Sequence, residues 1–229
     1  MTTTHDTQVA LATTAPSTSW PRVVRTATAA GTLLFLAGQA ALPVLPNSIE
    51  DAFPGMVAHR DQLMASRLLT SIGCFLLVLT GVALATMLAR RVGRSRTVRV
   101  GGALVAVGMF FNAVAQAVQG YATYVATGAG VDAESGQVVV QDIVAGPVGF
   151  PLSFASVPLF AIGFVVVAIG LYVSRAVPVW LPTLLLVGTV MAGALAGRGP
   201  VVALTQAPVT IALIALAALM TRPRATADA

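Results

Sequence analysis

A line of polar residues runs through one otherwise apolar stretch of the chain. Asn112, Gln116, Gln119 and Thr123 follow the spacing i, i+4, i+7, i+11, which places them on one face of a helix. An amide that faced lipid would leave its hydrogen bonds unmade, at a cost of several kcal/mol. We therefore expect this face to point into a helical bundle, where its amides can hydrogen-bond a ligand.

Further polar residues interrupt apolar stretches near the same predicted membrane boundary: Gln39, Arg67, Arg198 and Gln206. A charge at the bilayer centre costs roughly 2.5–3.5 kcal/mol, and a charged residue within a span is by default a functional one. The alternative is that the guanidinium group snorkels to lipid phosphates. Snorkelling is the favoured interpretation for Arg198, which lies in a tight turn, whereas for Arg67 both interpretations stay open.

Titratable groups gather in one predicted loop, residues 46–62. The loop contains Glu50, Asp51 and His59, and it is the one concentration of side chains in this sequence that could do acid–base work. A solvated, salt-bridged loop is the favoured alternative. No set of His, Cys, Asp and Glu has metal-ligand spacing, and no nucleotide-binding or hydrolase motif is present. The sequence therefore predicts neither a metal site nor a cofactor.

Composition places these residues in a membrane protein. Of the 229 residues, 57% are hydrophobic and 9% are charged, against roughly 25% charged in a soluble domain. Backbone polar groups in lipid must be satisfied within their own element, which predicts an all-α fold. A span needs about 20 apolar residues, and six stretches meet or approach that length: about 23–45, 63–89, 98–126, 148–174, 178–197 and 201–221. We predict a polytopic bundle of six transmembrane helices over residues 22–221.

Arginine sets the predicted orientation. Five of the thirteen arginines fall in residues 90–99, and a short Arg-rich loop stays in the cytoplasm. With that loop inside, ten arginines are inside and three outside, and the acids of the loops fall outside. Both termini are then cytoplasmic, with tails at 1–21 and 222–229, in a bacterial inner membrane. The chain has no Lys and no basic stripe with aromatics, which argues against a nucleic-acid partner.

Polarity also differs between the two predicted halves of the bundle. On the cytoplasmic side, residues 72–85 are polar only at Cys74 and Thr80, and residues 157–171 are apolar. Amides and hydroxyls gather in the outer half instead. The sequence thus predicts a dry inner half and a polar outer half.

Local signals in the loops and spans are less decisive. Phe53-Pro54-Gly55 is a turn signal, and the pattern after it is typical of a helix that extends the second span outward. The loop around 127–147 is either a short hairpin or a lid. Small residues at GxxxG-like spacing, Gly193 with Gly197 and Ala113 with Ala117, indicate close helix packing, which is commoner within one chain than in a homodimer.

Two resemblances follow from these features. The stretch 59–69, the Arg-rich loop behind it and Ser174–Pro178 resemble a large group of uncharacterised six-span actinobacterial membrane proteins; this covers most of residues 23–221 and implies a fold but no activity. In size and span count the chain is also similar to small membrane-embedded terpene cyclases. That resemblance implies an acid that protonates an olefin or epoxide. Glu50 is a candidate for this role, but no acid lies in the last spans.

Three functional hypotheses result. The leading one is a pocket in the outer half of the membrane that binds a small amphiphile or lipid, with Arg67 at the polar head, amides hydrogen-bonding it and the dry inner half holding an apolar tail. The second is an intramembrane enzyme acting on an isoprenoid or lipid, with Glu50 or Asp51 as proton donor. The third is a non-catalytic subunit of a membrane complex.

Overall fold

The computed structural model describes residues 19–93, 95–147, 149–194 and 200–221. Within them the chain is helical and has no strand, which confirms the all-α class for these residues. The α-helices are α1 (Ser19–Ala40), α2 (Ile49–Ala58), α3 (Arg60–Ala83), α4 (Ala89–Arg91), α5 (Arg96–Ala126), α6 (Ala133–Ala145), α7 (Gly149–Ser174), α8 (Trp180–Ala194) and α9 (Pro200–Thr221). A π-helical turn, Leu84–Leu88, joins α3 to α4.

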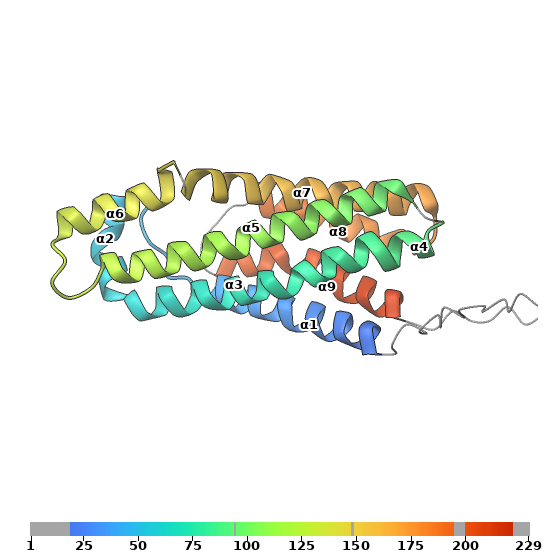
Figure 1. Cartoon of the computed structure of the whole chain (residues 1–229), viewed down its shortest axis with the longest axis horizontal. Coiled ribbons are helices and arrows are strands. Elements are labelled where there is room, and N and C mark those ends of the chain that lie inside the picture. The colour runs from blue at the N-terminus through green and yellow to red at the C-terminus, as the bar shows by residue number, and fades with distance from the viewer. Residues whose placement is uncertain (1–18, 94, 148, 195–199, 222–229) are drawn as a thin grey trace, which may run out of the picture.

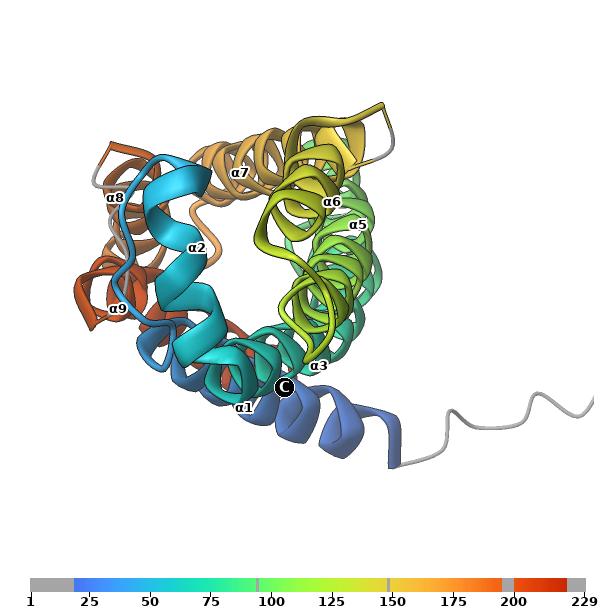
Figure 2. The ribbon, with the colours of Figure 1, turned by 90° about the vertical axis from the view of Figure 1, so that its left-hand side faces the viewer.

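The long helices lie side by side and alternate in direction (Figure 1). Each packs against the next in the order α1, α3, α5, α7, α8, α9, and α9 packs back against α1. They therefore form a closed ring, which Figure 2 shows from one end. The short helices α2 and α6 lie across this end of the ring and contact each other.

Helix length and composition are compatible with a membrane protein that crosses the bilayer several times. The helices long and apolar enough to cross, among the described residues, are Arg60–Arg91, Arg96–Ala126, Phe154–Ser174 and Leu204–Thr221. Trp180–Gly193 is apolar but shorter, and α1 carries Arg22 and Arg25 in its first turns. The prediction of six spans and cytoplasmic termini goes beyond these four helices.

The predicted turn at Phe53-Pro54-Gly55 is wrong, because these residues lie inside α2. Ser48 caps this helix by accepting a hydrogen bond from the Asp51 backbone N–H at 3.2 Å. Phe53 is buried against Ala126 and Val140. The cap and this burial outweigh the local preference of Pro-Gly for a turn. The predicted outward extension of the second span is confirmed, since α3 begins at Arg60.

The hairpin alternative for residues 127–147 is also wrong, because residues 133–145 form α6. Asp132 caps this helix by accepting a hydrogen bond from the Ser135 N–H at 2.8 Å. That bond lowers the pKa of the exposed Asp132 carboxyl, so the cap is fully present at neutral pH and weakens as acid protonates it. Of the valines in α6, Val140 is buried against Phe53 and Ala126, whereas Val138 and Val139 are exposed.

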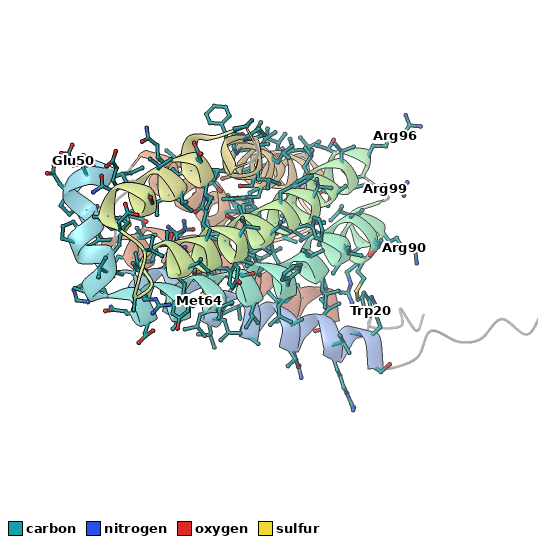
Figure 3. All side chains as sticks on the ribbon, turned by 60° about the vertical axis from the view of Figure 1, so that its left-hand side comes forward. Trp20, Glu50, Met64, Arg90, Arg96 and Arg99 are labelled. Atoms are coloured by element: carbon teal, nitrogen blue, oxygen red, sulfur yellow. The ribbon has the colours of Figure 1, made fainter. Side chains whose placement is uncertain are left out.

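The two halves of the ring differ in packing. We call the half next to Arg90, Arg96 and Arg99 the arginine half and the other the polar half; Figure 3 shows these arginines at one end and Glu50 at the other. The arginine half is filled by buried apolar side chains, among them Leu84, Leu88, Val98, Leu171, Leu181 and Met220. A well-packed apolar core of this kind leaves little room for a ligand.

Glycines bring neighbouring helices into backbone contact. A Cβ atom added at Gly101 of α5 would lie 2.7 Å from the Val167 nitrogen and 2.8 Å from the Gly163 oxygen of α7. A Cβ added at Gly73 of α3 would lie 2.6 Å from the Phe35 nitrogen of α1. By contrast, Gly193 has nothing within 4 Å of an added Cβ, and Gly197 lies outside the described residues.

Replacing Gly101 with alanine should destabilise the bundle, because the new methyl group meets backbone atoms that cannot move aside. We expect a loss of about 1–3 kcal/mol, measured as unfolding in detergent micelles. Gly193→Ala is the matched control, since its methyl group enters open space and alanine has the higher helix propensity. Equal stability of the two variants would contradict the close α5–α7 approach.

Candidate functional site

Among the cavities lined by described residues, two lie in the polar half. The first, the end cavity, lies beneath α2 and α6 and has a volume of about 260 Å³. Segment 42–49 and helices α2, α3, α5 and α6 line it. Its polar side chains include Arg67, Gln119 and Thr123, and its apolar ones include Leu45, Met56 and Val140. It combines one cationic group with apolar walls.

The second cavity, the ring cavity, lies inside the ring and has a volume of about 280 Å³. Helices α1, α5, α7, α8 and α9 contribute to its wall. Its polar side chains are Gln39, Asn112, Gln116, Thr189, Thr205 and Gln206, and its aromatic ones are Phe35, Phe160 and Phe164. None of the described residues that line it is charged. The ring cavity is thus an apolar space with amides and hydroxyls in its wall.

A chain of hydrogen bonds links the two cavities. Arg67 of α3 donates from Nη1 to Oε1 of Gln116 on α5. Gln116 donates from Nε2 to Oδ1 of Asn112 at 3.3 Å, and Asn112 donates from Nδ2 to Sγ of Cys74 at 3.3 Å. Arg67 lines the end cavity and Gln116 lines the ring cavity, so this pair lies between them.

The packing of α3 on α5 positions the Arg67–Gln116 pair. A Cβ added at Gly120 would lie 2.7 Å from Cβ of Arg67, so glycine at this position leaves room for the stem of the arginine against α5. One turn further along α3, Ser71 donates to the backbone oxygen of Ala113 at 2.8 Å. These contacts fix the register of the two helices, and the guanidinium group is directed into the ring.

The polar face predicted on α5 exists, but its residues are divided between two cavities. Asn112 and Gln116 line the ring cavity, together with Gln39 from α1 and Gln206 from α9. Gln119 and Thr123 line the end cavity with Arg67. The structure therefore brings the predicted amides and Arg67 into one half of the bundle. Arg198 lies outside the described residues.

The candidate acid–base residues lie elsewhere. Glu50, Asp51 and His59 are exposed on and beside α2, and none of them lines either cavity. The hydroxyl of Ser48 donates to the Asp51 carboxylate at 2.6 Å, as part of the α2 cap. Within the described part of the chain, no three His, Cys, Asp or Glu side chains are arranged to hold a metal ion.

Sequence reasoning missed the aromatic wall of the ring cavity. Phe160 and Phe164 of α7 are one helical turn apart and meet edge to face, with ring centroids 6.2 Å apart. Phe35 approaches from α1. The i, i+4 spacing of the first two was visible in the sequence, but the contribution of Phe35 depends on the closure of the ring.

A second cation of α3 also has a structural partner. Arg60 donates from Nε to the backbone oxygen of Tyr124 at 2.9 Å, and its guanidinium carbon lies 3.7 Å from the centroid of the Tyr124 ring. This cation–π contact joins the start of α3 to the end of α5. It stabilises the end of the ring on which α2 and α6 lie.

Comparison with protein-family models, with curated proteins and with solved structures finds no match for this chain. The geometry of these two cavities is therefore the basis for its proposed function.

The Arg67–Gln116 hydrogen bond should appear as an energetic coupling. We expect Arg67→Met and Gln116→Leu to be non-additive in stability by about 1.5–3 kcal/mol, the range for a hydrogen bond to a charged group. Unfolding of the single and double variants in detergent measures it. Arg67→Met with Gln206→Leu is the control pair and should be additive within about 0.5 kcal/mol. Additivity in both pairs would contradict the bond.

Proposed function

We propose that this protein is a small multi-pass membrane protein that binds a small amphiphilic or lipid-like molecule in the polar half of its helical ring. The observation that carries the proposal is the contrast between the halves. The interior of the arginine half is filled by its own side chains, and the cavity of about 510 Å³ at that end lies beside the α7–α8 turn, where exposed residues such as Arg175 and Pro178 line it. The polar half instead contains two neighbouring cavities between the helices, lined by Arg67 and several amides. Convergent polar groups in an otherwise apolar cavity are typical of a ligand site.

The proposed orientation places the arginine half toward the cytoplasm. Arg90, Arg96 and Arg99 lie at one end of the ring and Glu50 lies at the opposite end (Figure 3). This distribution supports a membrane in which all six long helices cross, α1 and α8 included, with the cavities near the outer leaflet.

The proposed ligand position follows from charge and packing. An anionic or strongly polar head would lie in the end cavity beside Arg67. The apolar part would lie against Phe35, Phe160 and Phe164 of the ring cavity, rather than in the arginine half, which the core fills. The alternative of acid catalysis by Glu50 or Asp51 has less support, because neither residue lines a cavity.

The orientation can be tested by cysteine labelling. The chain has one cysteine, the buried Cys74, so single exposed cysteines can be introduced into a Cys74→Ala background. Ala129, between α5 and α6, and Ala176, between α7 and α8, are both exposed and lie at opposite ends of the ring. A membrane-impermeant maleimide added to intact cells should label Ala129→Cys and leave Ala176→Cys unlabelled until the membrane is opened.

The reverse labelling pattern would indicate that the protein has the opposite orientation in the membrane. Labelling of both sites in intact cells would contradict a transmembrane arrangement, provided that a cytoplasmic control protein stays unlabelled in the same cells.

Ligand binding can be tested by mass spectrometry of molecules that co-purify with the protein in mild detergent. We expect the wild type to retain an amphiphile, and the Arg67→Met, Gln116→Leu double variant to retain at least about tenfold less, because it loses a charge-assisted site. Arg90→Met, an exposed arginine at the other end, is the matched control. Identical bound species in all three proteins would argue against the proposed site.

A further inference from the structure

Arg67 fixes the orientation of two amide groups in the wall of the ring cavity. An arginine side chain only donates hydrogen bonds, so Gln116 must present its oxygen to Arg67 and its nitrogen to the other side. That nitrogen donates to the Asn112 oxygen, which in turn directs the Asn112 nitrogen to the Cys74 sulfur. The hydrogen bonds therefore determine which terminal atom of each amide is the oxygen and which is the nitrogen.

Each amide in this relay of hydrogen bonds keeps one N–H donor that is not used within it. An amide NH₂ group has two N–H donors, and each of these two amides uses one of them within the relay. Each oxygen accepts one bond and keeps a second lone pair, but a carbonyl oxygen with one bond is common in native structures, whereas an unpaired N–H is rare. Among described residues, the group of Gln116 and of Asn112 with the greater need of a partner is therefore an N–H. Because both residues line the ring cavity, α5 presents hydrogen-bond donors to it. The favoured ligand group at this wall is an acceptor.

The other residues of the ring cavity disfavour a charged ligand, and its volume disfavours a long one. No charged side chain lines it among the described residues, and Phe35, Phe160 and Phe164 supply aromatic surface. Burying an ion without a partner charge is strongly unfavourable. A volume of about 280 Å³ lies just below the roughly 300–1,000 Å³ of sites for drug-sized ligands. The part of the ligand that fits the ring cavity is therefore a neutral, ring-sized group rather than a long acyl chain.

We propose that the ring cavity binds a neutral carbonyl-bearing ring, such as the head of a quinone, whose oxygen accepts hydrogen bonds from Asn112 and Gln116. Gln39 and Gln206, on α1 and α9, complete the site. Neither makes a side-chain hydrogen bond to a described residue, so either amide can turn to suit a second polar group. This inference rests on the proposed function in that it names the chemical class held by part of the same site.

Two probes of the same shape test the proposal. Dimethylnaphthoquinone carries two carbonyl groups, and its methyl groups block addition of the Cys74 thiol; dimethylnaphthalene has the same rings without the carbonyls. Equilibrium dialysis against protein in lipid nanodiscs, corrected with empty nanodiscs for partition into lipid, gives both affinities. The wild type should bind the quinone about tenfold more tightly than the hydrocarbon, as expected for two modest hydrogen bonds.

Variants identify the groups responsible. Asn112→Leu removes one donor and should bring the two affinities within about threefold of each other. Tyr121→Phe, on the exposed side of the same helix and lining neither cavity, is the matched control and should keep the wild-type preference. In Arg67→Met the Gln116 amide can turn over, so the preference for the quinone should fall while binding of the matching dihydroxynaphthalene, a hydrogen-bond donor, rises. If Arg67 only stabilised the fold, Arg67→Met would lower the binding of both the quinone and the dihydroxynaphthalene.

The outcomes separate this inference from the proposed function. Equal binding of quinone and hydrocarbon by the folded wild type overturns the inference, even when an amphiphile co-purifies through Arg67. A clear quinone preference that survives Asn112→Leu also overturns it, because the donors would then not be the recognising groups. A preference that depends on Asn112, in a protein that retains no amphiphile on purification, supports the inference while contradicting the proposed amphiphile site.

Discussion

The ring depends on backbone-to-backbone contact between neighbouring helices. In lipid, apolar side chains gain nothing by leaving the solvent, so helices associate through close packing and hydrogen bonds. Here glycines seven residues apart, two helical turns, face the same neighbour: Gly31 and Gly38 face α3, Gly101 and Gly108 face α7, and Gly163 and Gly170 face α5. Repeats of seven suit helices that cross at a small angle, which keeps them in contact along their length and lets the ring close.

Close packing of α3 on α5 then allows one cation to organise the polar half. Arg67 reaches Gln116 because Gly120 leaves room for its stem. In the described residues no fully buried side-chain nitrogen or oxygen lacks a hydrogen-bond partner, so these buried atoms meet the requirement that lipid imposes on interior polar groups. A second relay, in which the hydroxyls of Thr28 and Thr80 share a 2.8 Å hydrogen bond, joins α1 to α3 in the same way.

The sequence predicted the helical class, the polar face of α5 and the start of α3, because these depend on periodicity and on the cost of unpaired amides. It could not predict that Phe53-Pro54-Gly55 lies in a helix, because burial of Phe53 against Ala126 and Val140 is a tertiary effect. The GxxxG pattern includes Gly193, which has open space around it, whereas the glycines in close helix contacts are seven residues apart. The Arg67–Gln116 contact lies where the polar face is divided between the two cavities. Its residues are 49 positions apart in the sequence, so periodicity could not predict it.

The difference in side-chain size between the two halves accounts for the ring cavity. In the arginine half the helices bury large side chains such as Leu84 and Leu181 completely. A few turns away the small residues Gly193, Ala192 and Ala161 border the ring cavity. A cavity weakens packing in proportion to its volume, and larger apolar residues at such positions would fill it at little cost to helix formation. Small residues beside fixed amide donors are what a bound ring would require, because its own atoms would then replace the missing side chains.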